Sequence, residues 1–456
     1  MDLRGWLEQA VDWHERWAGG FGEYQPHPAL DVGQERFAEA FGELTERLGG
    51  DNYPFFHPRY AGQMLKPPHP AAIAGYVAAM QINPNNHALD GGPATAELEK
   101  EVVAQLAAMF GLGTHLGHLT TSGTIANLEA LFVARETHPG LGVAYSADSH
   151  YTHERMCHLL GVEGHPVPVD AAGRMDLTAL EQLLATGRIG TVVLTAGTTG
   201  LGAVDPIHEA LPLRERYGVR LHVDAAYGGF FALIADDSPD GVASAPWRAI
   251  AGCDSVVVDP HKHGLQPYGC GAVLFADPAV GRFYRHDSPY TYFTSDQLHL
   301  GEISLECSRS GASAAALWLT LRLLPLTDKG LGGVLRPGRR AALRWAELLA
   351  GSAHLAPYQR PELDIVAYLP RRATLSQVDE ASEWLMRRGM TDSADPVYLA
   401  TYAVTGQSLR ERGHRVTADV PRGRILRSVL MKPEAEEYLD RLHGRVEELA
   451  AMCHVS

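Results

Sequence analysis

The chain has 456 residues, of which 45% are hydrophobic and 20% charged, as in a globular protein long enough for two or three domains. Its formal charge is −15, from 39 basic and 54 acidic residues, and no basic run is present, which argues against nucleic acid and anionic membranes as partners. The five cysteines are scattered without a CxxC pair, so they predict neither a disulfide framework nor a structural zinc site.

The first 95 residues predict two amphipathic helices followed by proline-rich, irregular chain over 55–70 and 82–95. Acidic residues occur early in the N-terminus and no apolar core follows them, so no signal peptide is expected. No run approaches the ~18 consecutive apolar residues of a membrane span. A cytoplasmic protein is the resulting expectation.

Residues 96–325 predict an α/β domain on a largely parallel sheet, because apolar strands alternate with helices. The expected strands are 141–146, 191–196, 220–225, 254–259 and 271–275, and the expected helices include 97–110, 124–136 and 175–185. In such sheets the ligand lies at the carboxyl ends of the strands. Residues 326–456 predict a smaller α+β domain, with a helix over 332–350, strands over 364–370, 396–404 and 424–431, and a closing helix over 434–452.

The stretch "DPHKHGLQPYGCGAVLF" places Lys262 between two histidines, after one apolar strand and before another. Burial or a nearby cation would lower the pKa of such a lysine and make its amine a nucleophile toward an aldehyde. The alternative is a lysine at a strand end whose amine reaches water. This stretch alone does not distinguish a nucleophilic lysine from one that reaches water, so the other segments of the chain are needed.

Four further segments lie at predicted strand ends or helix starts. "HVDAAYGG" puts Asp224 just after a strand, where it is either a turn residue or a carboxylate facing a protonated ring nitrogen. "TTSGTIAN" (120–127) opens a helix whose free N–H groups suit a phosphate, although it is also an ordinary N-cap. His150 begins the next helix, as a capping residue or as a ring lying on an aromatic ligand, and "TAGTTGLGAVDPI" (195–207) forms a turn. No histidine, cysteine or carboxylate spacing predicts a metal site.

Together these segments resemble the group II pyridoxal-phosphate decarboxylases of fold type I, the family of glutamate, aromatic-amino-acid and tyrosine decarboxylases. "DPHK" followed by "CG", "HVDAAYGG" and "TAGTTxxGAVDPI" carry the resemblance, which covers about residues 50 to 435. The resemblance implies a large domain on a mostly parallel seven-stranded sheet with helices on both faces, a small C-terminal domain and an N-terminal helical segment used in dimerisation. It also implies pyridoxal 5'-phosphate as cofactor, an L-amino acid as substrate, and a homodimer with the site at the subunit interface.

By this resemblance Lys262 binds the cofactor's aldehyde, Asp224 keeps the ring nitrogen protonated, and His150 and Ala226 cover the two ring faces. The remaining cofactor contacts that it implies are Gly123, Thr124 and His261 at the phosphate and Thr198 near the ring.

The resemblance also implies residues on the substrate side. Pro93 and His87 lie in the matching substrate loop, and Arg427 in "LRSVLMKP" would bind the substrate carboxylate through its fork-shaped guanidinium. The stretch after the lysine, "HDSPYTYFTSDQ", offers Tyr290 or Tyr292 as the proton donor, and the sequence does not decide between them.

Two departures from the family pattern bring the chain nearer the bacterial and archaeal tyrosine/aspartate branch. His263 follows the lysine where animal enzymes often have Trp, and the phosphate turn reads "TTSGT" without a double glycine. We expect an amino-acid decarboxylase that forms an amine and CO₂ from an acidic or aromatic substrate. The alternatives are an aldehyde synthase that decarboxylates and then oxidatively deaminates, another fold-type I enzyme such as an aminotransferase or carbon–carbon lyase, and a non-catalytic cofactor-binding protein.

Overall fold

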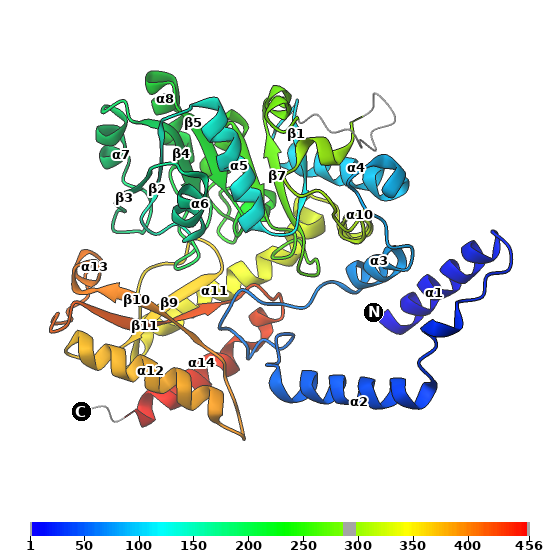
Figure 1. Cartoon of the computed structure of the whole chain (residues 1–456). Coiled ribbons are helices and arrows are strands. Elements are labelled where there is room, and N and C mark those ends of the chain that lie inside the picture. Colours follow the sequence, from blue (N-terminus) through cyan, green and yellow to red (C-terminus); the bar gives the residue numbers. More distant parts are fainter. Residues whose placement is uncertain (1, 286–297, 454–456) are drawn as a thin grey trace.

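The computed structural model describes residues 2–285 and 298–453 (Figure 1). A large unit built on one sheet lies beside a smaller unit built on a second sheet, and the first two helices extend to one side. Among these residues, no helix has the length and hydropathy needed to cross a membrane.

The described part of the large unit forms a seven-stranded sheet with the order β1-β7-β6-β5-β4-β2-β3. Its strands are β1 (Leu116–Thr120), β2 (Gly142–Ser146), β3 (Gly164–Val167), β4 (Ile189–Thr195), β5 (Arg220–Asp224), β6 (Ser255–Val258) and β7 (Gly271–Phe275). Strands β3, β2, β4, β5 and β6 pair in parallel, whereas β7 pairs antiparallel with both β6 and β1. The expected mostly parallel sheet is confirmed.

Helices cover both faces of this sheet because its strands are apolar on both sides. Along β6, Val256 and Val258 belong to the core cluster that includes α4, α7 and α8, whereas Val257 packs against α5 on the other face. The helices of this unit are α4 (Pro93–Met109), α5 (Gly123–Thr137), α6 (Thr152–Leu160), α7 (Leu177–Leu184), α8 (Ile207–Tyr217), α9 (Ser244–Ala249) and α10 (Ala312–Leu323).

The described residues of the smaller unit form a four-stranded antiparallel sheet with the order β10-β11-β9-β8. Its elements are β8 (Leu355–Pro357), β9 (Ile365–Pro370), β10 (Ala400–Thr405), β11 (Arg422–Val429), α11 (Gly333–Gly351), α12 (Leu375–Thr391), α13 (Gly406–Glu411) and α14 (Ala435–Met452). Trp345 of α11 and Tyr368 of β9 are fully buried in its core, and their rings are in contact.

The N-terminal segment comprises α1 (Leu3–Gly19), α2 (Gln34–Asp51) and α3 (Pro70–Met80). Helix α3 packs against α10, and α1 packs against α3. Helix α2 buries none of its own residues within this chain. Its apolar side chains share one face by their spacing and are at least half exposed; they are Phe37, Phe41, Leu44 and Leu48.

Each strand expected from the sequence is present, and the structure adds β1, β3 and β8. The two sheets fall within the expected ranges 96–325 and 326–456. The boundaries of the three expected domains stay a prediction.

Candidate active site

Lys262 lies in the turn that follows β6, and its Nζ is 3.0 Å from Asp259 Oδ2. Burial lowers the pKa of this lysine, but the charge and hydrogen bond of Asp259 outweigh burial, so its pKa is raised above the usual value. The expected lowering of the Lys262 pKa is therefore wrong for this structure. The reason is a neighbouring carboxylate three residues earlier, which stabilises the ammonium form.

Asp224 ends β5, and its carboxylate is bound from two sides. His153 Nε2 lies 2.9 Å from its Oδ2, and the N–H of Ala226 donates to its Oδ1 at 3.1 Å. Burial favours the neutral acid, but these bonds and the charge of His153 dominate, so the pKa of Asp224 lies well below its usual range. A buried anion therefore sits at the end of a central strand.

The N-terminus of α5 faces this anion and the lysine. Ser122 caps the helix, and its Oγ accepts a hydrogen bond from the Ile125 N–H at 3.3 Å. Gly123 leaves space that a side chain would fill, because a Cβ there would lie 2.6 Å from Asp259 Oδ2. Free N–H groups at a helix start suit a phosphate.

His150 precedes α6 and faces the same space. Its Nδ1 accepts from the Thr152 N–H at 3.2 Å and lies 2.6 Å from the Thr152 hydroxyl. Burial lowers the pKa of His150, so a neutral imidazole is favoured. Because Nδ1 is an acceptor, its ring proton is assigned to Nε2.

These side chains line one cavity of about 160 Å³. Seven of the expected site residues border it: Gly123, Thr124, His150, Asp224, Ala226, His261 and Lys262. Thr195 Oγ1 and Asp259 Oδ1 also belong to this cavity and are buried without a hydrogen-bond partner among the described residues. A polar ligand would satisfy such atoms.

Four expected residues are placed elsewhere by the structure. The Thr198 hydroxyl accepts from the Ala203 N–H at 3.1 Å and so closes its own turn; Gly197 and Thr199 border the cavity in its place. Arg427 lies behind that turn and donates to the carbonyls of Thr199, Gly200 and Gly62 at 2.6, 3.0 and 3.3 Å.

His87 and Pro93 are likewise absent from the residues that border the cavity in the described part of this single chain. Pro93 is exposed at the first position of α4, where a proline is favoured. The roles expected for these four residues remain predictions. Tyr290 and Tyr292 lie outside the described residues.

Sequence reasoning assigned no role at this site to His153, Tyr227, Asp259 or Asp364. His153 in the first turn of α6 holds Asp224, and because His150 precedes that helix, no helical spacing marks this role in the sequence. Tyr227 borders the cavity and donates to Asp364 Oδ1 at 2.5 Å, and His263 Nε2 lies 2.9 Å from Asp364 Oδ2. Asp364 comes from the smaller unit, so no local sequence pattern marks it.

The family model of the pyridoxal-dependent decarboxylase conserved domain matches residues 55–351. The chain belongs to the pyridoxal-dependent decarboxylase family. An L-tyrosine decarboxylase from Enterococcus faecium is 29% identical over 453 residues, which cover 75% of this chain and 74% of that protein. A probable L-tyrosine/L-aspartate decarboxylase from Methanothrix thermoacetophila is 30% identical over 317 residues, which cover 68% of this chain and 77% of that protein.

Solved structures share the fold of this decarboxylase. Mouse CSAD has a TM-score of 0.78 at 22% identity, covering 94% of this chain and 90% of that one. The Oryza sativa TDC determined with PLP and tryptamine has a TM-score of 0.78 at 20% identity, covering 98% of each chain. The expected fold class and family are confirmed, and the chain is a pyridoxal-phosphate-dependent amino-acid decarboxylase.

The cavity fits this cofactor by the chemistry of its lining. It holds one amine for an aldehyde, one buried anion for a pyridinium nitrogen and one helix N-terminus for a phosphate. The unsatisfied Thr195 Oγ1 and Asp259 Oδ1 face the same space. Among the described residues, no group of three or more potential ligands is placed to hold a metal ion.

Proposed function

We propose that this decarboxylase converts an L-amino acid to the corresponding amine and CO₂, with Lys262 as the residue that binds the cofactor's aldehyde. The observation that carries this proposal is the meeting of the Lys262 amine, the ionised Asp224 and the start of α5 in one buried cavity. Pyridoxal phosphate, once bound, supplies an electron-withdrawing ring that takes up the electron pair left on Cα when CO₂ departs.

The residues around this cavity would each hold one part of the cofactor. Asp224, fixed by His153, would keep a proton on the ring nitrogen, because a carboxylate with a lowered pKa stays ionised beside it. His150 is neutral and would lie on one ring face, with Ala226 on the other. The phosphate would be bound at the start of α5 by Gly123 and Thr124 and by His261.

On the substrate side we retain Arg427 as the group that binds the α-carboxylate. Its guanidinium touches the carbonyl of Thr199, which itself borders the cavity, so a small change of side-chain position would bring it to the site. His87 and Pro93 stay proposed substrate contacts, and Thr198 a proposed cofactor contact. Tyr290 or Tyr292 is the proposed donor of the proton that returns to Cα.

L-tyrosine and L-aspartate are the first substrates to test, because the curated relatives bear these names. The two side chains differ in charge and shape, and the residues that border the cavity do not select one of them. An aldehyde synthase remains the nearest alternative, since it shares every step up to the loss of CO₂.

We further propose a cytoplasmic homodimer. The exposed apolar stripe of α2, formed by Phe37, Phe41, Leu44 and Leu48, supports the dimer, since helices seldom expose such a face to water. The neighbouring helix α1 adds Trp13 and Trp17, which are exposed and stacked on each other. A second copy of this chain is the occupant we expect on this surface.

The test begins with covalent attachment of the cofactor. The purified protein should be yellow, and borohydride should fix the cofactor to a peptide that contains Lys262. Lys262→Ala should abolish the attachment and nearly all CO₂ release, whereas Lys329→Ala, at an exposed position, should change neither. A colourless protein that turns over without added cofactor would refute the assignment.

The second part of the test is a screen of the protein amino acids in which CO₂, amine and aldehyde are all measured. Stoichiometric amine and CO₂ from one amino acid would support the proposal. Aldehyde with hydrogen peroxide would favour the synthase, and the absence of CO₂ from every substrate would favour a non-catalytic cofactor-binding protein.

A further inference from the structure

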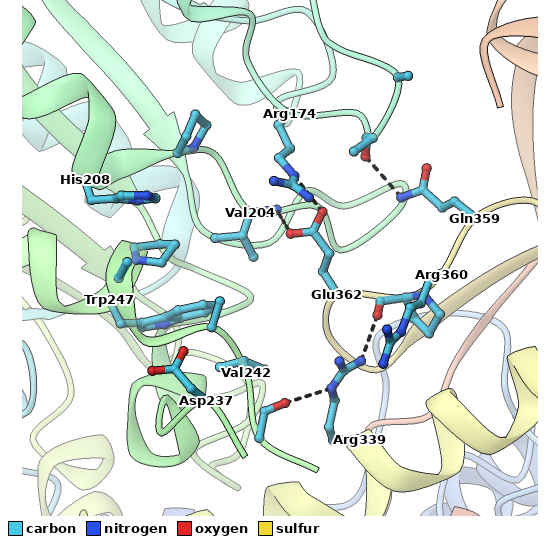
Figure 2. Close-up of a pocket in the computed structure, with 18 of the residues that line it drawn as sticks. Arg174, Val204, His208, Asp237, Val242, Trp247, Arg339, Gln359, Arg360 and Glu362 are labelled. Carbon is cyan, nitrogen blue, oxygen red and sulfur yellow. Dashed lines mark hydrogen bonds and ion pairs between the residues drawn. The ribbon is translucent and has the colours of Figure 1, made fainter. Parts of the chain in front are cut away.

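A second cavity, of about 900 Å³, lies between the two units and shares no bordering residue with the Lys262 cavity (Figure 2). One wall comes from the large unit, from the segment that leads into α8 and from residues 237–247, which follow the 3₁₀ helix Gly229–Ile234. The other wall comes from α11 and the connection between β8 and β9. A molecule bound in this cavity would therefore not occupy the cofactor and substrate site.

Arg339 of α11 is a buried cation in this wall, with only 7% of the residue exposed. Its Nε donates to the Gly241 carbonyl at 3.2 Å, and its Nη1 donates to the carbonyls of Pro361 and Leu363 at 2.9 and 2.8 Å. Within the described ranges Arg339 makes no ion pair, and its Nη2 makes no hydrogen bond. Neutral carbonyls bind the guanidinium, while the carboxylates of Asp364 and Glu362 act on its charge without bonding to it.

The charge of Arg339 persists at neutral pH. Burial and the nearby charge of Arg360 lower its pKa to about 10, which still leaves the guanidinium protonated. Arg360 lies beside it on the same wall and has neither a hydrogen bond nor an ion pair with the residues that the structure describes (Figure 2). Arg339 and Arg360 thus make no ion pair with the described residues, and neither does Arg412, which also borders the cavity and is bound by Gln359 and the Ser408 carbonyl.

The acidic residues of the cavity, in contrast, already have partners. Glu362 pairs with Arg174 at 2.9 Å. Asp237 accepts from the N–H and hydroxyl of Ser244 at 2.8 and 2.6 Å. The others that border the cavity are bound in the same way: Glu411 by Gln407 at 2.8 Å and Glu209 by His208 at 3.5 Å. Arg360 is thus the charged side chain of this cavity that has no hydrogen bond or ion pair with the residues that the structure describes.

The facing wall holds apolar side chains together with Asp237 and His208. Figure 2 shows Trp247 across the cavity from Arg339 and Arg360. Val242, Pro206 and Pro246 also border the cavity. The Trp247 indole N–H is already bound to the Gly228 carbonyl, so the indole presents no free donor to the cavity. A ligand here would place a carboxylate on the arginines and an apolar body on the opposite wall.

We propose that this cavity is a second ligand site, which binds a small organic carboxylate with a flat apolar body through Arg339 and Arg360. The inference does not depend on the decarboxylation chemistry, since binding is measured without turnover. The probe is phenylacetate, titrated into the holoenzyme by calorimetry, with the neutral phenylacetamide as its isosteric partner. We expect phenylacetate to bind at least about tenfold more tightly than phenylacetamide, because a charge-assisted hydrogen bond is lost with the carboxylate.

Variants separate this site from the rest of the molecule. Arg360→Gln should weaken phenylacetate binding about tenfold or more, and its exposed side chain makes the variant safe for folding. Arg344→Gln, on α11 but outside the cavity and paired with Asp440, is the matched control and should leave binding unchanged. Arg339→Gln should also abolish binding, but it removes three bonds to carbonyls, so Arg360→Gln decides the case.

Three results would overturn the proposal. The first is no heat of binding for phenylacetate up to about 10 mM, a concentration that detects even weak complexes. The second is binding that Arg360→Gln leaves unchanged, which would place phenylacetate elsewhere, including the Lys262 cavity. The third is inorganic phosphate that binds as tightly as phenylacetate and is lost in Arg360→Gln, because the apolar wall would then contribute nothing.

Discussion

His153 Nε2 lies 2.9 Å from Asp224 Oδ2, and both side chains are buried at the end of β5. The histidine comes from α6 and the aspartate from the centre of the sheet, so the bond joins two elements that are 71 residues apart in the chain. Burial alone would raise the pKa of Asp224 and favour the neutral acid, whereas this bond lowers the pKa and favours the carboxylate. His153 is thus a positioning residue for the anion that would face the cofactor ring.

We expect His153→Phe to lower kcat by about 10- to 100-fold, because Asp224 would lose a charge-assisted hydrogen bond while staying buried. The absorbance of the bound cofactor should then titrate at a different pH than in the parent. His153→Gln keeps a donor at that position and should restore much of the rate. His158→Gln, exposed on the same helix, is the control. A parental rate and pH profile in His153→Phe would show that Asp224 does not depend on this bond.

Substitution of Arg427 tests whether this arginine binds the substrate carboxylate. We expect Arg427→Lys to lower kcat/KM by about 10- to 100-fold, because one ammonium cannot reproduce a bidentate fork. The cofactor spectrum should be unchanged if the arginine serves the substrate. Arg424→Lys on the same strand, where Asp379 and Glu383 bind the side chain, is the control and should leave kcat/KM near the parental value.

Arg427 has an alternative role, which is to hold the turn beside the cavity. Its guanidinium holds the carbonyls of Thr199 and Gly200 in the structure. If Arg427→Lys reduces cofactor affinity and leaves KM unchanged, the arginine maintains that turn and does not bind the substrate.

Much of the site could be predicted from local sequence because parallel strands end at one edge of the sheet. Asp224 pairs in register with Val257 of β6, so the segments that follow β5 and β6 must meet. That geometry brings Asp224 and Lys262 together whatever the rest of the chain does. Both strands could also be predicted from their apolar sequence, because strands of a sheet that is covered on both faces are apolar on both sides.

The parts that escaped prediction depend on contacts distant in sequence. Strand β1 is short and interrupted by Gly117 and His118; it pairs with β7, and His118 is buried 3.0 Å from Glu129 of α5. Thr198 does not border the cavity, because its hydroxyl accepts from the Ala203 N–H within its own turn, and its expected contact with the cofactor stays a prediction. The partner of His263, Asp364, belongs to the smaller unit and could not be found by spacing.

Substitution tests Tyr290 and Tyr292, which lie outside the described residues. A phenol near Cα that returns the proton after CO₂ loss gives amine, because general acid catalysis outcompetes slow oxidation by O₂. We expect one of Tyr290→Phe and Tyr292→Phe to lose amine and gain aldehyde, ammonia and hydrogen peroxide while CO₂ release continues. Each variant is the control for the other. If both form amine at the parental rate, the donor lies elsewhere, and His150 is the next candidate.

We expect buried Lys432 and partly buried Lys66 to make the free energy of unfolding depend on pH in the alkaline range. Lys432 is 3% exposed and donates to the Tyr60 carbonyl at 2.6 Å, and Lys66 donates to the Met431 carbonyl at 3.3 Å. Burial lowers the pKa of each to about 8, and for Lys432 the charge of Lys66 adds to this effect. In the unfolded chain both return to the ordinary lysine value near 10.4.

Between pH 8 and about 10.4 the unfolded chain therefore binds more protons than the folded one, so the free energy of unfolding rises with pH. The destabilisation is fully present below pH 8 and is relieved across that window. We expect the parent to gain about 1 to 3 kcal/mol more than Lys432→Met over this range, measured by thermal unfolding at several pH values. Lys329→Met, at an exposed lysine, should follow the parent throughout. Parallel curves for the parent and Lys432→Met would mean that Lys432 carries its proton equally in both states, and burial would then not govern its charge.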